Sequence, residues 1–236
     1  MQPTISKLKQ ELHSYSNRKK ARTHSRFFKT GKGEYGEGDL FIGVNVPNCR
    51  KVVKQFNNLS PDNIIRLLHS KYHEERLVAL LIMVDQFKSS GLKEQRIIYN
   101  IYLDNTKYIN NWDLVDLSAS KIVGAYLFGK NDQKLNKLAK SQSLWERRIS
   151  IIATLYNIYN NSFGKTLEIS EILLKDEEDL IHKAVGWMLR EVGKKDQARE
   201  EKFLKKHYKQ IPRTMLRYAI ECFPEAKRQK YLKGKI

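Results

Sequence analysis

Cysteine and long apolar runs are scarce in this chain of 236 residues. The two cysteines, Cys49 and Cys222, form no CxxC pair, so the sequence predicts neither a disulfide framework nor a cysteine-ligated metal site. No stretch approaches 18 uncharged apolar residues, which excludes a membrane span. Residues 1–16 have the pattern of an amphipathic helix and lack the apolar core of a signal peptide. These absences predict a protein of the reducing cytoplasm.

Acidic residues are also in short supply. Lys and Arg total 44 against 26 Asp and Glu, which gives a formal net charge of +18 spread along the chain. Such a field attracts polyanions, because neutralising phosphates releases condensed counterions and gives salt-sensitive affinity. We therefore expect nucleic acid as the partner, with a cytoplasmic location and association with the nucleoid when bound. A soluble basic protein without such a partner is the alternative.

Strictly alternating apolar and polar residues, the pattern of a half-buried strand, are missing as well. Apolar residues instead recur at helical spacing over 77–87, 149–159 and 181–188. Helix starts are indicated at Ser60 before Pro61, Asn111 before Trp112, Ser143 before Leu144, and Pro212. The sequence therefore predicts an all-α fold.

Amphipathic segments of similar length recur along the chain. They begin near Arg76, Asp113, Arg147, His182 and Arg213, at steps of 37, 34, 35 and 31 residues. A period of this size is typical of helical hairpins that stack into a curved solenoid, as in HEAT-like and armadillo-like repeats. An irregular helical bundle is the alternative, since the repeats share few identical residues.

One domain, 1–236, is expected, with N-terminal helices in 1–30 and the repeat array in 47–236. Residues 31–39, GKGEYGEGD, hold four of the twelve glycines and form the clearest loop. A glycine-rich phosphate loop needs a strand before it and a helix directly after it, and neither is predicted here.

Two pairs of side chains could carry chemistry. Trp112 and Asp116 are four residues apart, so a helix places the indole and the carboxylate on one face. Helix capping by the acidic residue is the plainer interpretation. Arg147 and Arg148 begin the next helical segment, where a guanidinium could bind a phosphate with two parallel hydrogen bonds or form an ordinary surface ion pair.

Trp187 lies at the edge of an apolar stripe, where an indole either stacks on nucleic acid or fills space between helices. His69 and His73 have the i,i+4 spacing of metal ligands, but Ser70 and Lys71 break the helix and position 77 is leucine. No serine or cysteine lies in a recognisable nucleophile motif. Neither a metal nor a cofactor is expected.

Three motifs in register resemble the AlkD family of alkylpurine DNA glycosylases. They are NWDLVD at 111–116, LWERR at 144–148 and AVGWMLRE at 184–191, in the family's order and spacing. The resemblance runs from about Arg26 to Tyr231. It departs from the family at Asn111, where characterised members can carry a second aromatic residue.

The resemblance implies HEAT-like repeats that bind double-stranded DNA as a monomer and excise N3- or N7-alkylated purines without a base-flipping pocket. It maps catalytic roles onto Trp112, Asp116, Arg148 and Trp187, and DNA contacts onto Trp112, Arg148, Trp187 and Asn45. It leaves Asp113 and Arg147 as neighbours. Two alternatives stay open: a non-catalytic relative that binds distorted or branched DNA, and a helical scaffold for protein partners.

Overall fold

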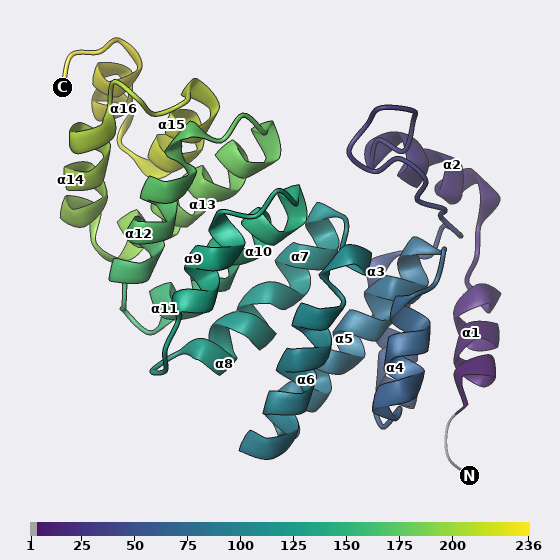
Figure 1. Cartoon of the computed structure of the whole chain (residues 1–236). Coiled ribbons are helices and arrows are strands. Elements are labelled where there is room, and N and C mark those ends of the chain that lie inside the picture. Colours follow the sequence, from purple (N-terminus) through teal and green to yellow (C-terminus); the bar gives the residue numbers. More distant parts are fainter. Residues whose placement is uncertain (1–3) are drawn as a thin grey trace. The chain divides into compact units, whose positions relative to one another are not determined.

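The computed structural model describes residues 4–236, and its regular elements in that range are helices (Figure 1). The one β feature among the described residues is an isolated bridge between Leu40 and Tyr72. The prediction of an all-α fold is confirmed. No helix in this part of the chain is both long and apolar enough to cross a bilayer. The chain divides into two compact units, Met1–Ile122 and Val123–Ile236.

Unit 1 is built around α5. Its helices are α1 (Ile5–Ser14), α2 (Arg18–Phe27), α3 (Val46–Phe56), α4 (Pro61–Leu68), α5 (His73–Ser89), α6 (Leu92–Asp104) and α7 (Trp112–Ala119), with a 3-10 turn at Thr106–Tyr108. Helices α3, α4, α6 and α7 all pack on α5, and α1 packs on α3 (Figure 1).

Helix α5 differs from the one-sided stripe predicted for it. Leu77, Leu80 and Leu81 are buried as expected, but all the remaining residues from His73 to Met83 are buried as well. A helix surrounded by neighbours on all sides must also bury its polar residues, and these need partners within the protein. The first four residues of α5, sequence HEER, are such a case.

Unit 2 contains the remaining helices. They are α8 (Ala125–Leu127), α9 (Gln133–Ala139), α10 (Leu144–Ala153), α11 (Leu155–Tyr159), α12 (Gly164–Ile172), α13 (Asp179–Lys195), α14 (Gln197–His207), α15 (Arg213–Ala219) and α16 (Glu225–Leu232). A π-helical turn at Ser120–Gly124 precedes them, and 3-10 turns lie at Leu173–Lys175 and Ile220–Cys222. Helices α10, α13 and α15 pack in succession, while α9 packs on α10 and both α12 and α14 pack on α13.

The close packing of α13 on α15 depends on Gly186. A Cβ atom at this position would lie 2.5 Å from the carbonyl oxygen of Met215 and 2.5 Å from Cβ of Tyr218. Real contacts of that length do not occur, so glycine allows the two helix backbones to approach.

The predicted helix starts agree with the structure. Helices α4, α7 and α10 begin directly after Ser60, Asn111 and Ser143, and α15 begins after Pro212. The expected repeat starts lie within three residues of the starts of α5, α7, α10, α13 and α15. The residue types at the helix starts and the helical period were therefore sufficient to locate these elements, although Ser60 and Ser143 make no side-chain capping hydrogen bond.

Candidate functional site

Helix α7 places Trp112 and Asp116 one turn apart. Asn111 is extended, and its side-chain oxygen accepts a hydrogen bond of 2.8 Å from the backbone N–H of Trp112. Both side chains are half-buried, so each has a part that faces solvent. Burial, followed by the charge of Asp116, raises the pKa of Tyr102 on α6 above its usual range. The Asp116 carboxylate is thus close to a buried hydroxyl group, at the edge of the core.

The indole of Trp112 belongs to an aromatic cluster. Its ring stacks on Phe28 with centroids 5.2 Å apart and meets the edge of Phe27 at 5.9 Å. Phe28 stacks in turn on Phe41, which stacks on His73. Phe27 is 63% exposed, so one end of the cluster lies in solvent while the other reaches the core. An exposed aromatic edge of this kind suits contact with sugars or bases.

The buried end of the cluster is an ionic network around His73. Nδ1 lies 2.9 Å from Oδ2 of Asp39, and Nε2 lies 2.9 Å from Oδ2 of Asp113. Arg76 donates to the other oxygen of Asp39, and the amide of Asn111 approaches Asp39 at 3.4 Å. The network therefore ties the end of the glycine-rich loop to the first turn of α7.

Burial disfavours charge on these groups, but their mutual attraction outweighs it. Burial alone would lower the pKa of His73, whereas Asp113 and Asp39 raise it to about 9. Burial alone would raise the pKa of Asp39, whereas the hydrogen bond from His73 and the charge of Arg76 bring it below its usual value. His73 is thus a cation between two carboxylates at neutral pH. Asp113 is thus part of the network that holds the fold together.

Glu74 holds the segment that leads into α3. Its carboxylate accepts hydrogen bonds from the backbone N–H groups of Ile42, Gly43 and Val44, at 3.0, 2.8 and 3.1 Å. Gly43 has a φ of +82°, and a Cβ there would lie 2.1 Å from the carbonyl oxygen of Asn17. This fixes the turn before α3, whose exposed N-cap is Asn45. The Asn45 oxygen accepts from the backbone N–H of Asn48, so it caps the helix.

In unit 2, the two adjacent arginines of α10 have different surroundings. Arg147 binds both oxygens of Asp176, at 2.5 and 3.3 Å, and the carbonyl oxygens of Ser141 and Gln142. Arg148 is 5% exposed and donates to the carbonyl oxygen of Leu180 in the first turn of α13. Arg147 is thus neutralised by a carboxylate, and Arg148 is held in a fixed position.

Trp187 lies in the middle of α13 and is half-buried. Its indole N–H donates to Oε1 of Glu191 at 3.1 Å, and Lys194 binds the same oxygen at 2.7 Å. The indole is therefore oriented by a hydrogen bond one turn away on its own helix.

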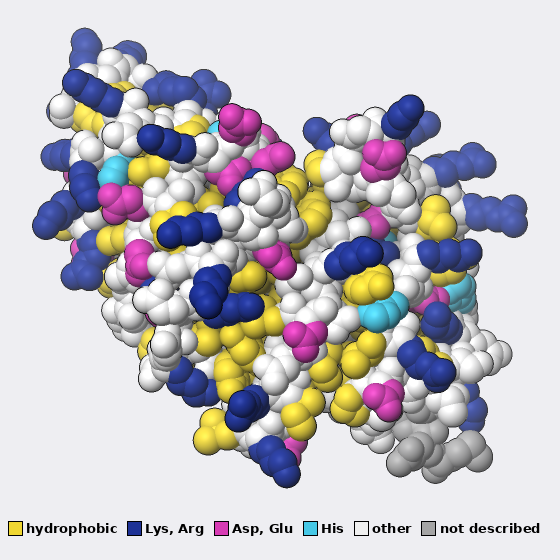
Figure 2. Space-filling model, viewed as in Figure 1, with side chains coloured by type: hydrophobic (Ala, Val, Ile, Leu, Met, Phe, Trp, Pro, Cys, Tyr) yellow, Lys and Arg dark blue, Asp and Glu magenta, His cyan; other side chains and the backbone are white. Residues whose placement is uncertain are grey.

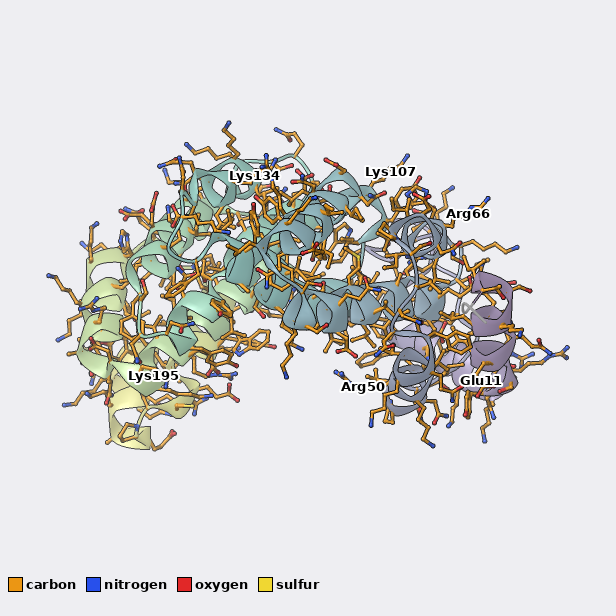
Figure 3. The ribbon with its side chains drawn as sticks, turned by 90° about the horizontal axis from the view of Figure 1, so that it is seen from below. Glu11, Arg50, Arg66, Lys107, Lys134 and Lys195 are labelled. Atoms are coloured by element: carbon orange, nitrogen blue, oxygen red, sulfur yellow. The ribbon has the colours of Figure 1, made fainter. Side chains whose placement is uncertain are left out.

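On the face shown in Figure 2, Lys and Arg side chains are spread over both units, with acidic side chains scattered among them. Arg50, Arg66 and Lys107 of unit 1 and Lys134 and Lys195 of unit 2 are exposed and extend from the ribbon (Figure 3). The positive charge of the sequence is thus available to a polyanion. Among residues 4–236, no group of His, Cys, Asp and Glu is arranged to hold a metal ion.

Sequence reasoning did not find Phe27, Phe28 and Phe41, nor the role of His73. The adjacent phenylalanines among basic residues were a possible signal, since that interleaving is typical of nucleic-acid contacts. His73 gave no such signal, because its partners lie 34 and 40 residues away in the sequence.

Comparison with known proteins gives matches by sequence and by structure. Residues 8–223 match the sequence model of the DNA alkylation repair enzyme family. The structure resembles a predicted DNA alkylation repair enzyme from Enterococcus faecalis, with a TM-score of 0.68 and 17% sequence identity over 89% of this chain and 97% of that one. At this identity, the likeness supports the fold, a helical-repeat solenoid. No curated protein matches the chain.

Proposed function

The chain belongs to the DNA alkylation repair enzyme family, and we propose that it is a DNA glycosylase that hydrolyses the N-glycosidic bond of cationic N3- or N7-alkylated purines in duplex DNA. The observation that carries this proposal is the half-buried Asp116 carboxylate one helical turn from the half-buried indole of Trp112. The high positive charge supports a polyanionic substrate. The proposed enzyme acts as a monomer and needs no cofactor.

The chemistry of the lesion determines what the protein must supply. Alkylation at N3 or N7 makes the purine a cation, so the base leaves as a neutral molecule when the bond to the sugar breaks. The remaining barrier is the positive charge that develops on the deoxyribose, as in other glycoside hydrolysis. A carboxylate beside that sugar lowers the barrier because it attracts charge that exists only in the transition state.

We assign that role to Asp116, which also orients the attacking water. In unit 1, the face of Trp112 binds the sugar and adds the attraction of an aromatic ring for a cation. In unit 2, we assign to Trp187 an aromatic contact with the DNA. Arg148 binds a neighbouring phosphate, and Asn45 contacts the DNA backbone. Both guanidinium groups have partners within the protein: Arg147 binds Asp176, and Arg148, which is 5% exposed, donates to the carbonyl oxygen of Leu180. The assignment to Arg148 therefore rests on the resemblance to the family.

Selectivity in this scheme comes from the lesion itself. Enzymes that flip a base into a pocket surround it with aromatic and polar walls. The proposed mechanism works from the backbone side and requires no such pocket, so neutral lesions should be poor substrates. Only adducts that already weaken the glycosidic bond would be released at a useful rate.

The test is release of methylated bases from duplex DNA. Purified protein is incubated with methylated duplex, and free 7-methylguanine and 3-methyladenine are quantified by chromatography. Asp116→Asn is expected to slow release by at least about a hundredfold, the effect of losing one preorganised electrostatic group, with little change in DNA affinity. Asp62→Asn, at an exposed position in the first turn of α4, is the matched control and should behave as wild type.

Three results would contradict the proposal. Near-normal release by Asp116→Asn would remove this carboxylate from the mechanism. Tight DNA binding by the wild-type protein without any base release would instead indicate the non-catalytic alternative. Affinity that is unaffected by salt would indicate the protein scaffold, since phosphate contacts weaken steeply as salt rises.

A further inference from the structure

Helix α2 has an excess of positive charge that the protein does not neutralise. Five of its ten residues are basic, none is acidic, and none is buried: Arg18, Lys19, Lys20, Arg22 and Arg26. Within the described range 4–236, none of the five forms an ion pair with a carboxylate, unlike Lys9, Arg76 and Arg147. Like charges four residues apart destabilise a helix. The basic row therefore has a cost to the fold that a binding partner would offset.

The arginines of α2 lie on one side of the helix and its anchors on another. Arg18, Arg22 and Arg26 are spaced by four residues, so they form a row. His24, 3.6 Å from Glu74, and Phe28 attach α2 and its C-cap to the rest of unit 1. The attachment leaves the arginine row facing outward.

This row borders an open pocket of about 480 Å³ lined by Ala21, Arg22, Ser25, Arg26, Leu40, Phe41 and Tyr72. The lining thus combines two guanidinium groups with an apolar floor and contains no carboxylate. Leu40, beside the two arginines, is 45% exposed, and an exposed apolar side chain is unfavourable in water. A ligand that fits the pocket has both an anionic part and an apolar part.

We propose that this pocket, the α2 cradle, binds the sugar–phosphate backbone of a DNA strand, with phosphates on Arg22 and Arg26 and a deoxyribose against Leu40 and Tyr72. Arginine forks match phosphate oxygens with paired hydrogen bonds. The step of four residues along α2 is about 6 Å, comparable to the separation of successive phosphates along a strand. This inference rests on the DNA partner of the proposed function but not on its excision chemistry.

The position of the cradle in unit 1 also supports a DNA strand. Phe41 lines the pocket and stacks on Phe28 at 5.1 Å, and Phe28 stacks on Trp112 at 5.2 Å. A strand whose sugar lies against Trp112 would therefore continue toward α2. The cradle would bind nucleotides next to the lesion, and so would set the register of the strand at Asp116.

The test measures binding of an unmodified duplex by fluorescence anisotropy at several salt concentrations. An undamaged duplex offers nothing to excise, so failure of the cradle and failure of the glycosylase proposal give separate results. For the double variant Arg22→Gln/Arg26→Gln, we expect the slope of log K against log salt to fall by up to about 1.8, because each phosphate contact contributes about 0.9. The control, Lys93→Gln/Arg96→Gln, removes the same charge from exposed positions on α6.

A third variant tests the sugar contact. Leu40→Ala should weaken binding several-fold without changing the salt slope, since it removes apolar surface and no charge. Equal slopes for the two double variants would mean that only net charge matters and would overturn the proposal. Competition by an acidic peptide at the cradle, with no loss of duplex binding in Arg22→Gln/Arg26→Gln, would also overturn it and indicate a protein partner. Circular dichroism checks that each variant is folded.

Discussion

Replacing His73 with leucine tests the ionic network that connects the glycine-rich loop to α7. Leucine has similar bulk but offers neither charge nor hydrogen bond. The change leaves both Asp39 and Asp113 buried. Asp39 keeps its contacts with Arg76 and Asn111, whereas Asp113 loses the cation that His73 supplied. A buried carboxylate that loses its partner keeps its desolvation penalty.

The expected cost follows from that penalty. Breaking a buried ion pair by removing one partner destabilises a protein by about 3 to 5 kcal/mol. For a chain of this length, each kcal/mol shifts the melting temperature by roughly 2 to 4 °C. His73→Leu should therefore lower the melting temperature by about 10 °C near pH 6.5. Thermal unfolding followed by circular dichroism at 222 nm measures this shift.

The pH dependence gives an independent check. The pKa of His73 is about 9 in the folded protein, against about 6.5 in an unfolded chain. A raised pKa contributes stability that is fully present below pH 6.5 and is lost as pH rises through 9, and 2.5 pH units correspond to ~3 kcal/mol. The gap between wild type and His73→Leu should therefore narrow between pH 7.5 and 9.5.

The control is His13→Gln. His13 also faces a carboxylate, with Nε2 2.8 Å from Glu75, but its side chain is 39% exposed and Lys9 binds the same carboxylate. Its loss should cost less than about 1 kcal/mol. A decrease below about 3 °C for His73→Leu, or a gap to wild type that stays constant from pH 7.5 to 9.5, would refute the reasoning.

Two further predictions concern unit 2, and both are measured as melting temperatures. Glu200 is 1% exposed, Oε1 lacks a hydrogen bond, and burial raises its pKa to about 9, so folding at pH 7 requires the acid to stay protonated. Keeping Glu200 protonated costs no free energy of folding below about pH 4, and the cost grows as pH rises toward 9. Glu200→Met should therefore stabilise the protein by ~3 kcal/mol at pH 7. An equal gain at pH 4 would contradict this. Gly186→Ala should destabilise by about 1 to 3 kcal/mol, because neither the Met215 carbonyl nor Tyr218 Cβ can move easily. Gly164→Ala, with nothing within 4 Å of the added Cβ, should be neutral or stabilising, and similar effects at the two glycines would refute the packing argument.

The helices were predictable because their causes are local. Asn111 and Ser143 precede helices whose apolar residues recur every three or four positions, and both features lie within a few residues of one another. The steps between repeats follow from the same period. For this reason the sequence predicted the starts of α7 and α10 within three residues.

The surroundings of the candidate site were less predictable. His69 and His73 have the sequence spacing of metal ligands, yet His73 binds two aspartates that no local pattern connects to it. Arg147 and Arg148 are adjacent and chemically identical, so only the structure distinguishes the one bound to Asp176. Side chains that meet across 29 to 40 residues, as these do, depend on packing, which composition and spacing do not describe.

The HEER segment at the start of α5 has a practical consequence for anyone who shortens this protein. Its four consecutive side chains reach partners in separate stretches of chain, and the Glu75 carboxylate, 1% exposed, takes both of its cations, Lys9 and His13, from α1. A version that starts after α1 would keep the partners of His73, Glu74 and Arg76 but would leave the ionised Glu75 carboxylate buried without either cation. The first helix is therefore an integral piece of unit 1, and expression tags belong ahead of it.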